Sequence, residues 1–278
     1  MIDLHLHSDC SDGTMSPDEI VHEAVKRELY AISLTDHDTL DGVKQIKKSK
    51  DIEKIHFISG IEMSCEALKK EIHILGYGID ENQDAFNQKL EYIREGRSHR
   101  NEDMIHMFQK DGFPITLEKL KHGNGDTVIT RAHFARVLVE EGICKSKDEA
   151  FQKYLGDDCK YYLKKPFFDP KEAISMIQSA GGVAVLAHPF QYNFSNKQLE
   201  DLICEWKEYG LEGIEVYHSS HHIGQSSRLK EWCCKYALMS TGGSDYHGTN
   251  KPQIQMGIGY GGLKVPDSLY DVLKNRCI

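Results

Sequence analysis

The first twelve residues carry side chains that could hold a metal ion. Residues 2–6 alternate apolar and polar side chains, which is the period-two pattern of a β-strand. This pattern puts His5 and His7 on one face, where two imidazoles would form a chelate. Asp12 follows in a loop rich in Ser, Asp and Gly. An isolated His-x-His is also typical of a half-buried strand with solvated histidines, so the assignment depends on the rest of the chain.

Further candidate ligands lie at or just past the C-terminal ends of other predicted strands. They are His37, Glu62, His188, Glu215 and Asp245. In a closed parallel βα barrel these strand ends converge on one face, where active sites are built. Scattered structural histidines have no reason to prefer strand ends. The set contains His, Asp and Glu but no Cys, which suits divalent cations such as Mn²⁺, Fe²⁺ or Zn²⁺.

The elements that must position these residues alternate between strands and helices. The pattern predicts strands at 2–6, 30–34, 56–61, 71–77, 182–187, 213–217 and 238–241. It predicts helices that begin at Pro17 and Pro170, and others at about 40–48, 196–209, 225–236 and 268–274. The short connection at 66–70 favours a hairpin between the third and fourth strands. We therefore expect an α/β fold.

The middle of the chain shows no βα alternation. Residues 84–111 have the pattern of a long charged helix, which Gly112-Phe113-Pro114 ends. A turn is expected at Gly123-Asn124-Gly125-Asp126, and Thr130 begins another helix. We interpret 93–165 as a helical insertion between two barrel parts, 1–92 and 166–278. The insertion either packs on the barrel or acts as a lid that supplies Arg or His to the substrate.

Composition limits the classes of function. The formal net charge of -9 argues against a broad basic face of the kind that binds duplex DNA, although not against a nucleotide in a metal-lined pocket. No apolar run approaches the ~18 residues that span a membrane, and the first residues carry no secretory signal. The eight cysteines form no Cys-x-x-Cys pair. Free thiols and a cytoplasmic location are expected.

Taken together, the motifs resemble those of the polymerase and histidinol phosphatase (PHP) superfamily. In chain order they are His5-x-His7 with Asp12, Thr35-Asp36-His37-Asp38, Gly60-Ile61-Glu62-x-Ser64, Ala187-His188-Pro189 and Gly243-Ser244-Asp245-x-His247. The resemblance implies a distorted seven-stranded βα barrel, a (βα)7 PHP barrel, with a trinuclear metal centre. The small helical insertion domain interrupts this match.

The resemblance also implies a distribution of ligands over three divalent ions. It assigns one metal to His5, His7, Glu62 and Asp245. It assigns a second to Glu62, His73 and His188, and a third to Asp12, His37 and His247. The family often has His where this chain has Asp12. The oxygen ligand favours Mn²⁺ or Fe²⁺ over Zn²⁺.

The insertion narrows the resemblance to the nucleotide-phosphoesterase branch of the superfamily. A Ser-Asp-Gly-Thr-x-x-Pro loop at 11–17 and Gly213-Ile214-Glu215-Val216 also resemble that branch. Its members remove the 3′-phosphate from nucleoside 3′,5′-bisphosphates, and some degrade short RNA from the 5′ end. Clustered divalent ions would activate a hydroxide for in-line attack, with no covalent intermediate. A histidinol-phosphatase-like or other small-molecule phosphatase would use the same ligands. A non-enzymatic metal-binding module would be expected to lack some of them.

Other residues are candidates for substrate contacts. His218 and His221 could protonate the leaving group. The candidates for phosphate binding all lie in the predicted insertion: Arg97, Arg100, Arg131 and His133. Arg131 is the first choice, because it opens a helix whose free N–H groups would also meet the anion. Asp36 and Asp38 are expected to orient imidazoles, or to cap the following helix.

Overall fold

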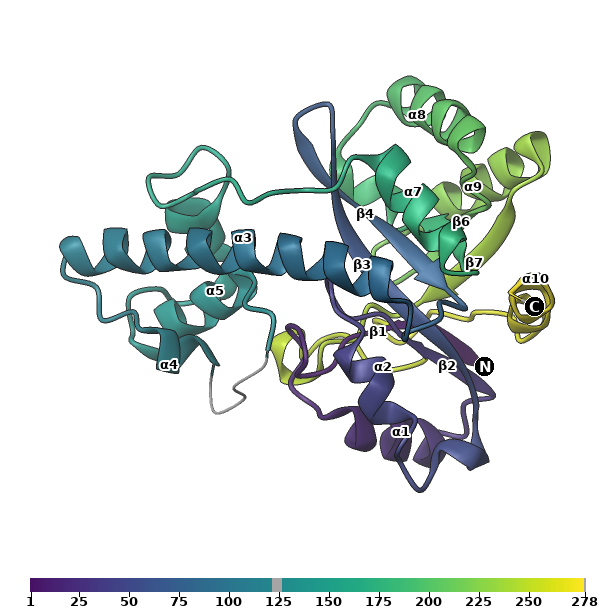
Figure 1. Cartoon of the computed structure of the whole chain (residues 1–278), viewed down its shortest axis with the longest axis horizontal. Helices are drawn as coiled ribbons and strands as arrows, with labels where there is room; N and C mark the ends of the chain where they lie inside the picture. Colours follow the sequence, from purple (N-terminus) through teal and green to yellow (C-terminus); the bar gives the residue numbers. More distant parts are fainter. Residues whose placement is uncertain (122–126, 278) are drawn as a thin grey trace.

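The computed structural model describes residues 1–121 and 127–277. Its seven strands form one sheet in which the spatial order is the chain order (Figure 1). The strands are β1 (Ile2–Leu6), β2 (Ala31–Leu34), β3 (His56–Ala67), β4 (Lys70–Tyr77), β5 (Val183–Leu186), β6 (Gly213–His218) and β7 (Met239–Gly243). Each predicted strand is therefore present, with shifts of a few residues at the ends.

The sheet is parallel except around β4. The strands β1, β2 and β3 pair in parallel, as do β5, β6 and β7, whereas β4 runs antiparallel to both β3 and β5. This confirms the predicted hairpin. The expected end of the third strand was wrong, because pairing with β4 continues from Gly60 to Ala67. Glu62 consequently lies inside a strand and not at its end.

The first and last strands approach each other closely enough to bring the sheet near to a closed barrel. The backbone N–H of Asp245 donates to the carbonyl oxygen of His5 at 2.9 Å, and that of His7 donates to the carbonyl of Tyr246 at 3.0 Å. Gly243 lies directly against β1, where a Cβ would come within 2.4 Å of the backbone nitrogen of His5. A side chain at this position would push the two strands apart. The seven-stranded barrel fold is thus confirmed.

Helices surround the barrel and form the insertion. The longer ones are α1 (Pro17–Lys26), α3 (Asp84–Lys110), α5 (Arg131–Glu140), α7 (Pro170–Ser179), α8 (Asn196–Tyr209), α9 (Ile223–Tyr236) and α10 (Ser268–Arg276). The shorter ones are α2 (Asp41–Ile46), α4 (Leu117–Lys121), α6 (Lys147–Ala150), η1 (Ile52–Lys54), the π-helical η2 (Phe151–Leu155), η3 (Pro189–Tyr192) and η4 (Gly248–Asn250). Ser16 and Glu19 form a capping box at the N-terminus of α1, which begins at Pro17 as predicted.

The helix α3 connects the barrel to the insertion, as Figure 1 shows. Its N-terminal part packs Phe86 and Leu90 into the core between the sheet and α7 and α8. Its C-terminal part packs Met104 and Phe108 into a separate core that the other insertion helices complete. A boundary at residue 92 falls inside this helix, so the exact domain limits stay a prediction. The predicted turn at residues 123–126 lies outside the described residues.

Two further expectations concern the chain as a whole. Each of the eight cysteines is a free thiol in the structure. Among residues 1–121 and 127–277, no helix is both long and apolar enough to cross a membrane.

Candidate metal centre

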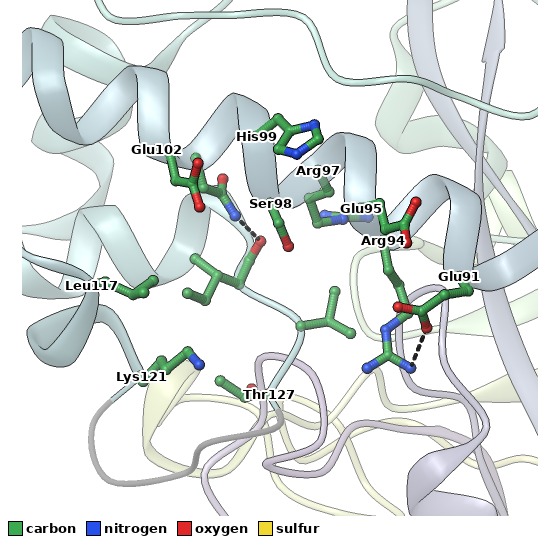
Figure 2. A pocket seen from close by; sticks show the side chains of 13 residues that line it. Glu91, Arg94, Glu95, Arg97, Ser98, His99, Glu102, Leu117, Lys121 and Thr127 are labelled. Carbon is green, nitrogen blue, oxygen red and sulfur yellow. Dashed lines mark hydrogen bonds and ion pairs between the residues drawn. The ribbon is translucent and has the colours of Figure 1, made fainter.

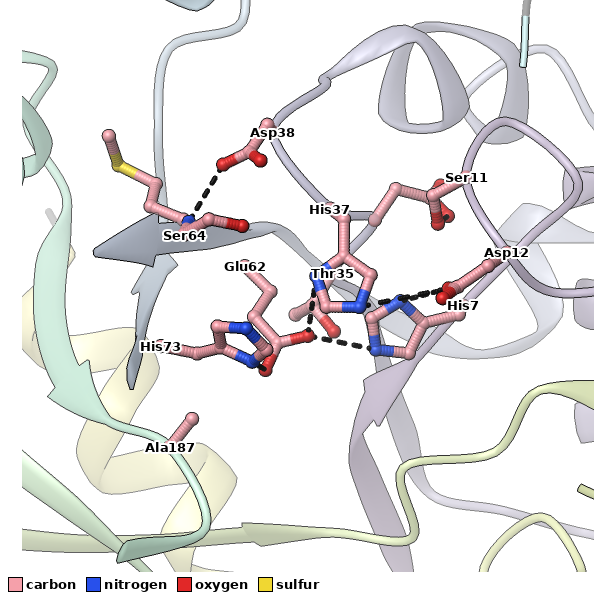
Figure 3. Close-up of polar contacts among 12 residues, drawn as sticks. His7, Ser11, Asp12, Thr35, His37, Asp38, Glu62, Ser64, His73 and Ala187 are labelled. Carbon is pink, nitrogen blue, oxygen red and sulfur yellow. Dashed lines mark hydrogen bonds and ion pairs between the residues drawn. The ribbon is translucent and has the colours of Figure 1, made fainter. Parts of the chain in front are cut away.

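The nine predicted ligands come together around the open end of the barrel. His5 on β1 and His7, the first residue after it, project on the same side, as their spacing predicted, and both are fully buried. Glu62 reaches them from β3, and His73 comes from the neighbouring β4 (Figure 3). The other ligands lie in the loops that follow β1, β2, β5 and β7: Asp12, His37, His188, Asp245 and His247.

Glu62 lies in the middle of this cluster, and each of its carboxylate oxygens faces different imidazoles. The distances from Oε2 to three imidazole nitrogens are 3.4 Å (His5), 3.2 Å (His7) and 3.1 Å (His37). The distances from Oε1 to two others are both 2.8 Å (His73 and His188). A carboxylate so placed can contact two cations at once.

The two aspartates occupy the sides of the cluster. Asp12 Oδ1 lies 3.1 Å from His247 Nε2 and 3.7 Å from His37 Nε2. Asp245 Oδ1 lies 3.5 Å from His7 Nε2 and 3.8 Å from His5 Nε2. The imidazole of His7 therefore stands between the two carboxylates.

Nitrogen and oxygen atoms with metal-binding ability gather here in five overlapping groups. In each group the ligand atoms lie within 4.8 Å of one another, and together the groups contain all nine predicted ligands. Several of these buried atoms have no hydrogen-bond partner: His5 Nε2, both ring nitrogens of His7, Asp12 Oδ1 and His37 Nδ1. Because a buried polar atom without a partner is costly, this concentration of free lone pairs fits divalent cations.

The electrostatics of five ligands favour the forms that bind metals, whereas nearby carboxylates raise the pKa of His5 and raise that of His73 to about 9. Burial by itself would raise the pKa of Glu62, but the surrounding imidazoles outweigh burial and hold it well below its usual range. Imidazoles likewise lower the pKa of Asp12, and Lys251 together with His247 lowers that of Asp245. Burial lowers the pKa of His188 to about 4 and that of His7 well below its usual range. These aspartates and Glu62 are therefore ionised, and both imidazoles keep a free lone pair, at neutral pH.

Two carboxylates outside the set of nine predicted ligands hold the cluster: Glu215, which the strand ends had also marked as a candidate ligand, and Asp3, to which sequence reasoning assigned no role. The carboxylate of Glu215 on β6 lies 2.9 Å from His5 Nδ1, and it accepts a hydrogen bond from the backbone N–H of His188 at 2.8 Å. Asp3 accepts hydrogen bonds from Ser244 and from the backbone N–H of Gly257. The β1 alternation was a usable signal for Asp3, which shares a face with His5 and His7.

The carboxylates beside His37 make different contacts from those expected. Asp36 accepts hydrogen bonds from Ser8 and Ser11, so it holds the loop that carries Asp12. Asp38 accepts from the backbone N–H of Ser64 and forms a buried ion pair with Arg97. Neither has a hydrogen bond to an imidazole among the described residues, and neither caps α2, whose N-cap is Leu40. The expectation that they orient imidazoles was wrong.

The backbone is strained at two predicted ligands. His188 has φ 22° and Asp245 has φ 59°, in the left-handed region that side chains rarely adopt. His188 and Asp245 each lie two residues after the end of a strand, β5 and β7 respectively, so the chain turns sharply there. Such strain persists where the surroundings impose it, and it is concentrated at functional sites.

A small cavity of about 180 Å³ opens beside the cluster and is rich in cationic side chains. Asp12, His37 and His73 line it together with Arg97, Arg100, Arg131 and Lys165. We call it the cationic cavity. Arg131 pairs with Glu71 at 3.0 Å and Asp157 at 2.9 Å, and Lys165 pairs with Glu71 at 2.9 Å. Lys165 follows the Tyr/Lys-rich stretch of the insertion, and no spacing in the sequence pointed to it.

The other residues predicted to contact the substrate do not line this cavity. His133 accepts a hydrogen bond from the backbone N–H of Thr130 as part of the capping box of α5. His218 Nε2 lies 3.5 Å from Asp245 Oδ2. His221 Nδ1 contacts the carbonyl of Val216 at 3.1 Å. Burial lowers the pKa of His221 to about 4.

A larger cavity of about 580 Å³ runs along α3, away from the cluster. Figure 2 shows that Arg94, Glu95 and His99 face it from this helix. It includes Arg97 but none of the predicted metal ligands. The cavity shares Arg97 with the cationic cavity.

The fold and the donor set define a class, the barrel enzymes that bind divalent metals with His, Asp and Glu at one barrel end. The family model of the PHP domain matches residues 3–210, and the chain belongs to this family. It is therefore a metal-dependent phosphoesterase, an enzyme that hydrolyses phosphoric esters. The resemblance found in the sequence motifs is thereby confirmed.

Three known proteins are similar over most of the chain. A 5′-3′ exoribonuclease of Haemophilus influenzae is 33% identical over 245 residues, which is 88% of this chain and 89% of that protein. A 3′,5′-nucleoside bisphosphate phosphatase of Chromobacterium violaceum is 33% identical over 247 residues, 88% and 87% of the two chains. A crystal structure from Bifidobacterium adolescentis, described provisionally as a metal-dependent phosphoesterase, superposes with a TM-score of 0.88 at 29% identity, over 100% and 96% of the chains.

Proposed function

We propose that the enzyme removes the 3′-phosphate from nucleoside 3′,5′-bisphosphates and also hydrolyses short RNA. The observation that carries this proposal is the cationic cavity, which shares Asp12, His37 and His73 with the metal cluster. A substrate with two phosphates can place one at the metals and the other against Arg97, Arg100 and Arg131. The names of the two curated relatives support the same substrate class.

The proposal includes three divalent ions, with Mn²⁺ favoured and Fe²⁺ or Zn²⁺ as alternatives. His5, His7, Glu62 and Asp245 would hold the first ion. Glu62, His73 and His188 would hold the second, and Asp12, His37 and His247 the third. The two-sided surroundings of Glu62 support its role as a shared ligand. Metal content per chain, measured by mass spectrometry after loading with Mn²⁺, tests the number.

The bound ions would supply a nucleophilic water at neutral pH and would neutralise the nonbridging phosphate oxygens. The chain itself orients the substrate. Arg100 and Arg131 would hold the distant phosphate, and Glu215 would keep the imidazole of His5 in place. Proton donation to the leaving oxygen is proposed for His218, since His221 is uncharged at neutral pH.

The test is a comparison of substrates in the presence of Mn²⁺. Adenosine 3′,5′-bisphosphate, adenosine 3′-monophosphate, a 5′-phosphorylated dinucleotide and histidinol phosphate are assayed side by side. The bisphosphate should have a much higher kcat/KM than the monophosphate, because only the bisphosphate reaches the cationic cavity. Preferential turnover of histidinol phosphate would contradict the proposal and would favour the small-molecule phosphatase alternative.

A further inference from the structure

Two more cavities continue away from the cationic cavity, and the first of them shares Asp12 and His37 with it. The first has about 670 Å³ and is lined by the predicted ligands Asp245 and His247, as well as by Asp12 and His37. The second has about 760 Å³ and lies over the N-terminal turn of α9. Both are lined by His218, Ser219 and Tyr260, so they adjoin one another. We call the two cavities together the downstream groove.

The charge of the downstream groove is opposite to that of the chain. Four lysines line it: Lys147, Lys230, Lys251 and Lys264. Apart from the predicted ligands Asp12 and Asp245, its only acidic lining residue is Asp148. The chain as a whole has a net charge of -9. A mostly cationic lining on an acidic protein points to an anionic occupant.

The four lysines differ in whether another group of the protein already contacts their ammonium group. Lys147 donates to Asn250 at 2.8 Å, and Lys251 pairs with Asp245 at 2.7 Å. Lys230 lies over the ring of Tyr217, 4.6 Å from its centroid. Within residues 1–121 and 127–277, no ion pair involves Lys230 or Lys264. Lys230 and Lys264, which line the second cavity, are thus available to an anion.

Tyr260 provides an aromatic surface where the two cavities meet. Its side chain is 58% exposed, although large apolar and aromatic side chains in this protein are mostly buried. It lines both cavities, in a segment that follows the strand β7 and its metal ligands. An exposed aromatic ring between cationic side chains is the arrangement that binds single-stranded nucleic acids without sequence preference.

We propose that the downstream groove binds the nucleotides on the 3′ side of the scissile phosphate of a short, 5′-phosphorylated, single-stranded oligonucleotide. Tyr260 stacks on a base, and Lys230 and Lys264 contact backbone phosphates. This inference rests on the proposed function and deepens it. It gives the cavities an order: terminal 5′-phosphate in the cationic cavity, scissile phosphate at the metals, remaining strand in the groove.

The chemistry explains why an exonuclease needs this groove and a phosphatase does not. In both reactions water attacks the phosphorus, the bond from phosphorus to the 3′-oxygen breaks, and that oxygen takes up a proton. From a bisphosphate the product is free phosphate. From an oligonucleotide the phosphate stays on the next nucleoside as its new 5′-phosphate, so that nucleotide must have space beyond the metals. The downstream groove provides that space, and its lysines carry a positive charge that complements the phosphates of the strand.

The test compares two substrates in one set of variants. The Mn²⁺-loaded enzyme is assayed on a 5′-phosphorylated triadenylate and on adenosine 3′,5′-bisphosphate. For Tyr260→Ala and for the double variant Lys230→Ala/Lys264→Ala, the ratio of kcat/KM for the trinucleotide to that for the bisphosphate should fall about tenfold. Tyr260→Trp should restore the ratio. The double variant should also weaken the dependence of trinucleotide KM on salt concentration.

Matched controls are available elsewhere on the surface. Tyr92 on α3 is 68% exposed, Lys48 follows α2, and neither lines the groove. Tyr92→Ala and Lys48→Ala should leave the ratio unchanged. An unchanged ratio in the groove variants would overturn the inference, as would hydrolysis of the bisphosphate alone by the wild-type enzyme. If the wild-type enzyme hydrolyses neither substrate, the proposed function itself fails.

Discussion

The metal cluster and the cationic cavity share Asp12, His37 and His73, but their charges are balanced in different ways. In the cluster, buried lone pairs of His5, His7 and Asp12 have no partner within the protein. In the cavity, Arg97 and Arg131 already pair with carboxylates. The cluster is therefore incomplete without cations, whereas much of the cavity is electrostatically satisfied before a phosphate arrives.

Arg100 is the exception in the cavity. Its described contact is a 3.4 Å hydrogen bond to the carbonyl of Leu163, and its Nε has no partner. Burial, together with the nearby charge of Arg97, lowers the pKa of Arg100 to about 9. Because no carboxylate must be displaced from it, we expect a phosphate to gain more from Arg100 than from Arg131. The sequence alone favoured Arg131.

The strongest test of the comparison removes one ligand of the cluster. His7→Ala or Asp245→Asn should lower kcat at least about a thousandfold, equivalent to ~4 kcal/mol, while circular dichroism stays unchanged. His22→Ala is the matched control, since His22 is exposed on α1 and pairs only with Asp51. Full turnover by either cluster variant would contradict the metal assignment.

The second test measures stability with and without metal. If cations complete the cluster, Mn²⁺ at a hundred times its Kd should raise the free energy of unfolding by about 2.7 kcal/mol for each site that it fills, and chelation should reverse the increase. Urea unfolding, followed by circular dichroism, gives the value. The Asp245→Asn variant should show a smaller increase. An equal response in both proteins would place the bound metal elsewhere.

The third test separates the two arginines. Arg100→Met should raise the KM for adenosine 3′,5′-bisphosphate about thirtyfold, since a charged hydrogen bond of about 2 kcal/mol is lost. Arg131→Met should have a smaller effect, because Glu71 and Asp157 already use its charge. Steady-state kinetics with adenosine 3′-monophosphate, which lacks the second phosphate, supply the control. Equal effects on both substrates would show that these arginines do not recognise that phosphate.

The smallest expected effect concerns pH. Burial lowers the pKa of Lys165 to about 8, with a further contribution from Arg97. Lys165 is therefore charged below pH 8 and loses its charge as the pH rises, so kcat/KM for the bisphosphate should fall about tenfold between pH 7 and 9, or ~1.4 kcal/mol. Lys165→Arg should shift this fall to higher pH. Identical pH profiles would exclude Lys165 from phosphate binding.

Sequence reasoning succeeded where the pattern is local. Alternation in β1 put His5 and His7 on one face, and strand ends pointed to His188 and Asp245. Sequence reasoning failed where pairing between strands determines the structure. The extension of β3 to Ala67, for example, depends on its pairing with β4. The contacts of Asp38 could not be predicted either, since its partner Arg97 is 59 residues away in the sequence, on α3.

Arg100 and Lys165 show the same limit at the candidate site. Whether a guanidinium is free or paired depends on which carboxylates fold next to it, and no spacing in the sequence encodes that. The candidate ligands fall in short motifs, whereas the cationic side chains are scattered along the insertion. The candidate ligands could thus be proposed from the sequence, but the ranking of the arginines needed the structure.

The continuity of α3 has a consequence for the evolution of the site. This helix has 27 residues, and its buried positions, among them Phe86, Leu90, Ile93, Arg97 and Arg100, form one stripe from the barrel core to the insertion core. With 3.6 residues per turn, one residue added between Ile93 and Arg97 would rotate both arginines by about 100° away from the metals. Insertions and deletions within that segment of α3 should therefore be poorly tolerated.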